Sequence, residues 1–474
     1  MKTVPFTIFF SLPCIVLGIL VLSCMVIPAK IYSAELVDPL NMGLTPDPDK
    51  GYNILMNTPM AAPIMKEKDL ERLWKVWDAP SKLIAADATP DQRRDMIFDR
   101  YGWAKRLDDS TGLPLGYLPD GKGNLVTNCF SCHGGEVGGV TIPGAGNAHI
   151  DLTTLATDIR KLTALDQGKD PDKVPDAMAP FKTPLSIHRG TTNAVVFAAV
   201  FAGLRDAKRG KLYTQHPEEL LHHDMNPPAW WNFKKKDMIY ADAFAPKTPR
   251  QLMPFAFSPF HSLEKFYSFE ENFVHIREYL DKLEPPKYPY EIDAALAKKG
   301  EIAFNRVCSE CHGTYGENPT FPNKVIKIKK IGTDPRRLES IYLKDREATN
   351  AGWLQYYGEH PVLLESKGYL AQPLDGIWAS APYFHNGSVP TLYHVFNIDE
   401  RPDVWKRSDN GYDNEKIGLE VESFYAVPTT NTDRERRLYY DTSVVGSSNQ
   451  GHPFPDDELE DDEKISVLEY LKTL

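Results

Sequence analysis

The sequence predicts a mainly α-helical protein of two domains, with long loops and little β structure. Apolar residues recur at helical spacing in several stretches, for example at 66–77 and 461–474. A Cys-x-x-Cys-His motif occurs twice, at 129–133 and at 308–312. Between the two copies, residues 284–290 read Glu-Pro-Pro-Lys-Tyr-Pro-Tyr. Prolines fix the backbone of such a linker, so we expect a semi-rigid strap and a domain boundary there.

The chain divides accordingly into an N-terminal segment at 1–34, one domain at 35–284 and a second at 285–474. Residues 36–63 are rich in Pro, Asp and Asn, which predicts an extended lead-in to the first domain. The helical stretches that we expect in the two domains are 66–77, 89–103, 151–165, 191–204, 270–283, 293–304 and 461–474.

The N-terminus carries an export segment. Lys2 is followed by an almost uninterrupted apolar run from residue 4 to 27, which is typical of a signal sequence and is also long enough to cross a bilayer. Three endpoints stay open: cleavage after Ala34, lipid attachment at Cys24, or an uncleaved membrane anchor. We therefore expect an exported protein of the periplasm or cell surface, with membrane attachment through the N-terminus as an alternative.

The composition excludes one class of partner. The net charge over the 474 residues is −11, which argues against a nucleic-acid binder. With 42% hydrophobic and 25% charged residues, the composition is that of an ordinary globular protein. Such an acidic protein is suited to docking a basic redox partner.

Each Cys-x-x-Cys-His motif predicts covalent attachment of a c-type haem, whose iron takes the histidine as an axial ligand. Cys-x-x-Cys alone also fits a redox dithiol or half of a zinc site. Two copies, both completed by His in an exported chain, favour two covalently bound haems. The cysteines concerned are Cys129, Cys132, Cys308 and Cys311, and the iron ligands are His133 and His312.

The ligand on the second face of each iron decides the chemistry. A second protein ligand gives an electron-transfer haem, whereas an open face binds a small oxidant. Two histidines are candidates for the second motif. His452 lies in the loop before the terminal helix, where small cytochromes c usually place this ligand, and His385 lies in the distinctive stretch 382–392. The alternative interpretation of His385 is a turn residue that contacts a haem propionate or the backbone.

The stretch at 382–392, Pro-Tyr-Phe-His-Asn-Gly-Ser-Val-Pro-Thr-Leu, resembles the signature of the bacterial di-haem cytochrome c peroxidase superfamily. In those peroxidases, a Met fourteen residues after the signature His is the distal ligand of the C-terminal haem. This sequence has Asp399 at that position, which removes the Met ligand. The order of helix 293–304 and second motif also resembles a monohaem cytochrome c, with Gly300 and Phe304 placed to pack on the terminal helix.

The wider pattern is similar to the rubber oxygenase branch of that superfamily, which are secreted di-haem dioxygenases that cleave polyisoprene. The resembling segments, which together span roughly residues 93–474, are 128–147, 189–193, 228–250, 285–289, 451–452 and 470–474. The resemblance implies two cytochrome c-like haem domains. It implies a C-terminal haem held by His312 and a distal histidine, for which we favour His452 over His385. It also implies an N-terminal haem with His133 on one face and no protein ligand on the other.

We therefore expect a haem-dependent oxidoreductase, with His133 at the reactive iron and the C-terminal haem relaying electrons. The small oxidant would be peroxide or dioxygen, and the second substrate an apolar organic molecule or a redox partner protein. A dioxygenase needs an apolar pocket, for which the candidates are Phe255, Phe257, Phe260, Trp230 and Trp231. A peroxidase needs an acid–base group near the iron, for which the candidates are Glu136, Glu264 and Glu270.

Two other functions stay open. The protein would be an electron carrier if His149, His188 or His261 capped the first haem. It would be a maturation-type oxidase acting on another protein if a redox-active Trp lay between the haems, the candidates being Trp353, Trp378 and Trp405. The run Lys234–Lys236 is either a solvated face or a docking patch.

Overall fold

The computed structural model describes residues 45–107, 111–175, 186–193, 222–253, 268–340, 343–350 and 363–474. Pro39–Leu474 forms one compact unit. The predicted export segment at 1–34 lies outside the described residues, and the predicted boundary between residues 284 and 285 stays a prediction. Within the described ranges, no helix is long and apolar enough to span a membrane.

The prediction of a mainly α fold with little β structure is wrong. Helices account for 41% of the described structure and strands for 16%, so the fold is mixed α/β. Most of the strands have two to four residues, which is too short for a periodicity read over windows of about 11–18 residues. The strands are β1 (Pro63–Lys66), β2 (Tyr117–Pro119), β3 (Asn124–Thr127), β4 (Gly134–Val137), β5 (Val140–Pro143), β6 (Met238–Ile239), β7 (Ala245–Pro246), β8 (Val325–Lys327), β9 (Gly368–Leu370), β10 (Val404–Asp413), β11 (Gly418–Phe424) and β12 (Tyr439–Asp441).

These strands form small antiparallel sheets. One has the order β1-β3-β2, with Leu118 opposite Val126, and another has the order β11-β10-β12. In the second sheet Trp405 of β10 lies opposite Tyr440 of β12, and the two rings stack with centroids 4.9 Å apart. The pairs β4-β5, β6-β7 and β8-β9 complete the described sheets.

The helices follow most of the predicted stretches. Those at 89–103, 151–165, 270–283, 293–304 and 461–474 are confirmed as α3, α5, α9, α10 and α17, whereas 66–77 forms the 3-10 helix η1, and 191–204 lies largely outside the described residues. The helices are α1 (Pro48–Asn57), η1 (Glu67–Val76), α2 (Ser81–Asp87), α3 (Pro90–Tyr101), α4 (Phe130–His133), α5 (Leu152–Asp166), η2 (Pro171–Lys173), η4 (Phe233–Lys235), α7 (Pro249–Leu252), α9 (Glu270–Lys282), α10 (Ala294–Val307), α11 (Ser309–His312), α12 (Ile328–Ile331), η6 (Arg336–Glu339), α13 (Leu343–Asn350), η8 (Ile377–Ala379), α14 (Leu392–Phe396), η9 (Ile398–Glu400), α15 (Asp433–Arg437), α16 (Phe454–Glu458) and α17 (Asp461–Leu471).

The predicted extended lead-in is wrong over 48–57, where the chain forms α1. The side chain of Asp47 accepts a hydrogen bond from the Lys50 amide at 3.0 Å, and Pro48 is the first helical residue. Pro and Asp suggested a loop, but both are also typical of a helix start. The buried Leu55 belongs to a cluster that includes Phe273 of α9, so α1 is part of the core.

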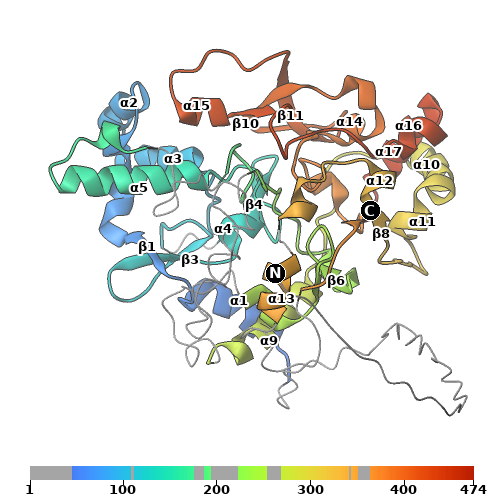
Figure 1. Ribbon diagram of the computed structural model, residues 1–474, viewed down its shortest axis with the longest axis horizontal. Coiled ribbons are helices and arrows are strands. Elements are labelled where there is room, and N and C mark those ends of the chain that lie inside the picture. Colours follow the sequence, from blue (N-terminus) through green and yellow to red (C-terminus); the bar gives the residue numbers. More distant parts are fainter. Residues whose placement is uncertain are drawn as a thin grey trace, which may run out of the picture. The chain divides into compact units, whose positions relative to one another are not determined.

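Helices α10 and α17 pack across each other as the resemblance to a cytochrome c implied, and they lie side by side in Figure 1. A side chain at Gly300 would collide with the backbone carbonyl of Ser466, so only glycine permits this approach. Phe304 meets Tyr470 with ring centroids 5.3 Å apart. This crossing fixes the helix that leads directly into the second Cys-x-x-Cys-His motif.

Candidate haem sites

The second motif forms the single turn α11 directly after α10. The amide of His312 donates to the carbonyl of Cys308 at 3.0 Å. Its imidazole Nδ1 lies 2.8 Å from the carbonyl oxygen of Gln372, which can only accept, so Nδ1 carries the proton. This bond sets the tautomer and leaves Nε2 available for a metal. Burial lowers the pKa of His312, which favours the neutral, ligating form.

The imidazole ring of His452 lies near that of His312. Their ring centroids are 6.3 Å apart. A metal–imidazole bond is about 2 Å long and the ring centre lies about 1 Å behind the bound nitrogen, so two imidazoles on opposite sides of one ion have centres about 6 Å apart. The spacing of His312 and His452 therefore matches that of two axial ligands on one iron.

The loop that carries His452 is held in an unusual backbone conformation. His452 has a φ of +55°, a left-handed value that is uncommon for a residue with a side chain. Its amide donates to the carbonyl of Ile331 in α12 at 2.6 Å, and Phe384 and Phe454 flank its ring. Burial lowers the pKa of His452 to about 3, so this imidazole is neutral at neutral pH.

His385 is placed differently. It stacks on Tyr369, with ring centroids 4.1 Å apart and planes 21° apart. Burial lowers its pKa to about 3, and its backbone carbonyl accepts from the amide of Asn226 at 2.9 Å. The structure therefore brings His452 to His312 and places His385 in a packed turn. Asp399, which replaces the peroxidase Met, is exposed on η9.

The first motif forms the turn α4 and leads directly into the hairpin β4-β5. The Nδ1 atom of His133 lies 2.9 Å from the carbonyl oxygen of Pro228, as His312 does from that of Gln372. The ring of Trp230 stacks on His133 at a centroid distance of 4.7 Å. Burial lowers the pKa of His133 to about 4. The described residues place no second histidine ring against His133.

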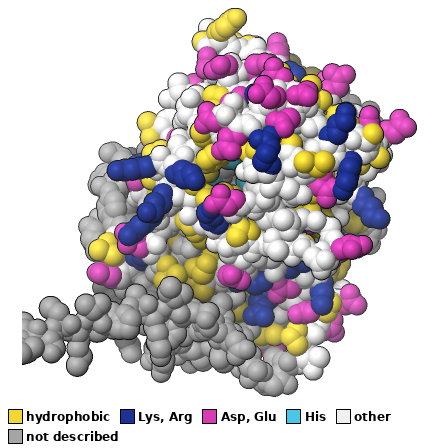
Figure 2. Space-filling view, turned by 90° about the vertical axis from the view of Figure 1, so that its right-hand side faces the viewer, with side chains coloured by type: hydrophobic (Ala, Val, Ile, Leu, Met, Phe, Trp, Pro, Cys, Tyr) yellow, Lys and Arg dark blue, Asp and Glu magenta, His cyan; other side chains and the backbone are white. Residues whose placement is uncertain are grey.

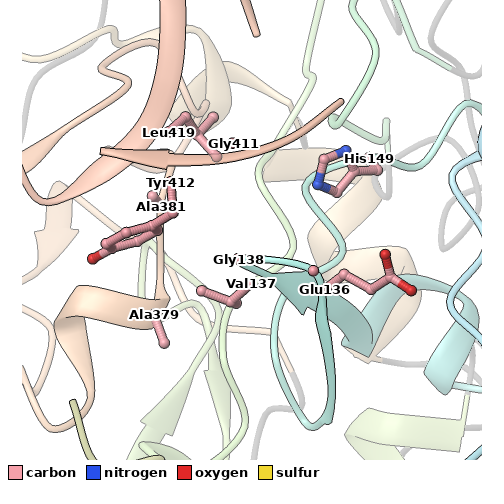
Figure 3. Close-up of a pocket in the computed structure, with 10 residues that line it drawn as sticks. Glu136, Val137, Gly138, His149, Ala379, Ala381, Gly411, Tyr412 and Leu419 are labelled. Atoms are coloured by element: carbon pink, nitrogen blue, oxygen red, sulfur yellow. The ribbon is translucent and has the colours of Figure 1, made fainter. Parts of the chain in front are cut away.

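A small pocket adjoins the first motif. Figure 3 shows Glu136 and His149 on one side of it and Tyr412 with Ala381 on the other. Glu136 accepts a hydrogen bond from the Thr141 hydroxyl at 3.3 Å, and burial raises the pKa of its carboxyl. The pKa of His149 is lowered well below its usual value, chiefly by burial.

Most other candidates are engaged elsewhere. The carboxylate of Glu270 is buried against the guanidinium of Arg250. The Nε2 atom of His188 accepts the amide hydrogen of Asp441 at 3.2 Å, and its ring stacks on Tyr440. The indole nitrogens of Trp378 and Trp405 donate to backbone carbonyls in the core. The candidates that lie outside the described residues are Phe255, Phe257, Phe260, His261, Glu264 and Trp353.

The lysine run does not form a free docking patch. Lys234 pairs with Glu284 at 2.7 Å and Lys235 with Asp375 at 2.7 Å. Lys236 is buried, and burial lowers its pKa to about 8.

Trp231, which the sequence suggested only as a candidate for an apolar pocket, joins the two motifs. Its indole Nε1 donates to the carbonyl of Asp375 at 2.7 Å. Trp231 lies three residues after Pro228, which orients His133, and Asp375 lies three residues after Gln372, which orients His312. One short hydrogen bond thus connects the two segments that hold the motif histidines.

The residues at both motifs fit c-type haems. The four motif cysteines are half-buried and form no disulfide. Both motif histidines have Nδ1 hydrogen-bonded to a backbone carbonyl, which directs Nε2 to a metal. At the second motif a further neutral imidazole stands at the distance that a shared iron requires.

One protein-family model matches a part of the chain. Residues 368–406 match the protein-family model described as RoxA-like, cytochrome c-like. This segment includes Gln372, Asp375 and His385. A cytochrome c-like domain implies a covalently bound c-type haem and indicates a haem cytochrome oxidoreductase. The match supports the resemblance to rubber oxygenase-like di-haem cytochromes, and the resemblance to the wider peroxidase superfamily stays an expectation.

Two curated relatives come from Sinorhizobium fredii (strain NBRC 101917 / NGR234). The uncharacterized protein y4iM is 28% identical over 202 residues, which cover 37% of this chain and 45% of the relative. The uncharacterized protein y4iJ is 28% identical over 257 residues, which cover 40% of this chain and 41% of the relative. The matches span less than half the length of either relative.

Proposed function

We propose that the protein is an exported di-haem c-type cytochrome oxidoreductase. Peroxide or dioxygen would be activated at the haem of the motif at 129–133, and the haem of the motif at 308–312 would relay electrons. The observation that carries the division of roles is the 6.3 Å spacing of the His312 and His452 rings. A haem supplies one-electron and oxygen chemistry, and the chain supplies its ligands, orientation and electrostatics.

The residues of the second motif suit electron transfer. His312 and His452 would occupy both axial positions and exclude small ligands from that iron. Two histidines give a lower potential than a histidine and a methionine, because a Met ligand raises the potential. The exposed side chain of Asp399 agrees with the loss of a Met ligand there.

Trp231 offers a route for electron transfer between the two motifs. From the Nδ1 atom of His133 the route runs through the carbonyl of Pro228 and the peptide chain to Trp231. The hydrogen bond from Trp231 to Asp375 continues it to the segment whose Gln372 carbonyl meets His312. The ring of Trp231 is buried, and its hydrogen bond to Asp375 and the bond between Gln372 and His312 are half-buried, which keeps this part of the route away from bulk solvent.

His133 would hold the reactive iron on one face, with its ring fixed by Pro228 and by the stacked Trp230. Glu136, three residues later, is the carboxylate that we propose to hold a proton near this motif. Its raised pKa keeps it protonated to a higher pH than an ordinary glutamate. The proposal that the other face of this iron is open rests on the resemblance to the rubber oxygenase branch.

The second reactant that we propose is either an apolar organic substrate or a redox partner protein. The face shown in Figure 2, on the right-hand side of Figure 1, bears Lys and Arg over its middle and acidic side chains gathered above them. A protein that docks there would need both charges, which favours a partner of mixed rather than uniform surface charge.

The spin state of the ferric holoprotein tests the proposal. We expect high-spin and low-spin haem in equal amounts, and carbon monoxide binding to half of the haem after reduction. Replacing Cys129 and Cys132 by Ala should remove the high-spin species, and the matched change at Cys308 and Cys311 should remove the low-spin species. If both haems are low-spin and reduction opens no site for carbon monoxide, the protein is an electron carrier instead.

A further inference from the structure

Arg401 is a buried cation that donates only to backbone carbonyls. Its side chain is 7% exposed. Nε donates to the carbonyl of His394 at 2.7 Å and Nη2 to that of Val395 at 3.1 Å. Nη1 donates to the carbonyls of Asn449 at 2.6 Å and Gly451 at 2.9 Å. Among the described residues, no carboxylate pairs with this guanidinium.

These four bonds join the signature stretch to the loop that carries His452. Two of the acceptors lie in α14, just after the stretch 382–392, and two lie within three residues of His452. The guanidinium also lies 5.0 Å from the ring centre of Phe384, whose ring is 6.1 Å from that of His452. Arg401 therefore contacts both the backbone before His452 and the aromatic ring beside it.

The loop needs such support because its backbone is strained. Gly451 has a φ of +90° and His452 a φ of +55°. A side chain at Gly451 would collide with the backbone of Gly332, so the loop runs tightly against the end of α12. Sparsely populated backbone conformations persist only where surrounding contacts over-determine them. Arg401 supplies two such contacts to the three residues that precede His452.

The charge of Arg401 has a second effect. A charge without an ion pair is costly to bury, and the carbonyl dipoles and the nearby carboxylate of Asp456 compensate it only in part. Burial lowers the pKa of Arg401 to about 10, which still leaves it protonated at neutral pH. A buried positive charge near a haem favours the state with one more electron, since a low-dielectric interior screens the interaction little.

We propose that Arg401 is a positioning residue for His452 and that its buried charge raises the reduction potential of the haem at the second motif. This inference rests on the proposed pairing of His312 and His452. The charge of Arg401 offsets part of the low potential that two histidine ligands confer, and so adjusts that haem to its role as an electron relay.

The test is a redox titration of the full-length holoprotein, followed by the low-spin haem spectrum, together with ferric electron paramagnetic resonance. Arg401→Gln removes the charge and keeps two donors. We expect it to lower the reduction potential by at least about 59 mV, which corresponds to a tenfold change in the one-electron equilibrium constant. Arg401→Lys keeps the charge but lacks the planar fork. We expect it to shift the low-spin resonance, or to expose high-spin signal, with less change in potential.

Arg106→Gln is the matched control. Arg106 is 8% exposed and donates to the backbone carbonyl of Tyr117 at 2.7 Å, so the change removes a similarly buried arginine from the region of the first motif. It should leave the potential of the low-spin haem unchanged. An equal shift in Arg106→Gln would overturn the proposal, as would a wild-type potential and spectrum in Arg401→Gln.

If the Arg401→Gln variant fails to bind haem, the Arg401→Lys variant tests the proposal instead. A wild-type resonance in Arg401→Lys would then refute the positioning role. The pairing of ligands is tested separately, in the wild-type protein. If the wild type has no low-spin haem that His452→Ala removes, the proposed ligand pair is wrong, whatever the Arg401 variants show.

Discussion

The indole Nε1 of Trp231 donates a 2.7 Å hydrogen bond to the carbonyl oxygen of Asp375. The donor belongs to the segment that orients His133, and the acceptor belongs to the segment that orients His312. The two motifs are 179 residues apart in the chain when counted from His133 to His312, and one hydrogen bond thus links the segments that orient them.

Trp231→Phe should separate the contribution of this hydrogen bond to electron transfer from its contribution to stability. The ring stays but the donor is lost, so we expect the rate of electron transfer between the haems to fall by about tenfold, equivalent to about 1.4 kcal/mol in barrier height. The unfolding free energy should fall by about 1 kcal/mol, because one hydrogen bond is lost. Flash photolysis and thermal unfolding measure the two effects.

Trp378→Phe is the control for this change. The indole of Trp378 donates to the carbonyl of Pro286 at 2.9 Å, in the same core but outside the link between the motifs. It should lose similar stability and keep the electron-transfer rate. Equal rates in wild type and Trp231→Phe would exclude Trp231 from the route.

His452→Ala should convert the haem of the second motif to high-spin while both haems stay attached, because the thioether bonds do not involve His452. His385→Ala is the comparison, since that ring stacks on Tyr369. It should leave the low-spin signal intact. The electronic absorption and resonance spectra of the ferric proteins distinguish these results, and the reverse pattern would identify His385 as the ligand.

His385 also predicts a pH dependence of stability. Burial lowers its pKa from the ordinary value of 6.5 to about 3. The unfolded chain therefore binds a proton at a pH where the folded protein does not. Stability is fully present above about pH 6.5 and is lost as the pH falls toward 3, by up to about 1.4 kcal/mol per pH unit for this group.

Urea unfolding at pH 7, 6, 5 and 4 measures this effect. His385→Gln should be less stable than the wild type at pH 7 but should lose less stability as the pH falls. Tyr369→Phe keeps the stacked ring and should keep the wild-type pH dependence. Parallel curves for the wild type and His385→Gln would rule out this titration.

Gly300→Ala should weaken the crossing of α10 and α17. The added methyl group meets the carbonyl of Ser466 and the side chain of Tyr470. Overpacking of this kind costs about 1–3 kcal/mol. We expect a lower thermal midpoint and an earlier loss of the low-spin signal on heating. Lys299→Ala, on the exposed side of the same helix, should be nearly neutral. A wild-type midpoint in Gly300→Ala would contradict the tight crossing.

The second motif and the helices around it could be located from the sequence because their signals are local. Cys308, Cys311 and His312 are adjacent in the sequence, and the helices around them have clear apolar periods. Gly300 and Phe304 pack on α17 as the resemblance to a cytochrome c implied. His452 lies where its position before α17 suggested, and the assignment of the iron ligands stays a prediction.

The remainder depends on contacts between distant segments, which have no local signature. Nothing in the sequence around Trp231 indicates that its indole meets the carbonyl of Asp375, 144 residues later. The paired strands β4 and β5 have four residues each, which leaves too few positions for an alternating pattern to predict them. Asp47 and Pro48 suggested a loop, although the same residue types are also typical of helix starts.

Helix α17 and the residues after it contact both the start of α10 and the segment that orients His312. The amide of Asp293, just before α10, donates to the carboxylate of Glu469 in α17 at 2.7 Å, and the amide of Gly376 donates to the carbonyl of Leu474 at 2.8 Å. Neighbouring ends are the arrangement that tolerates circular permutation and insertion into a host protein. The segment from Asp293 to Glu469 has neighbouring ends, so we expect it to tolerate a permuted order of its parts within a host protein.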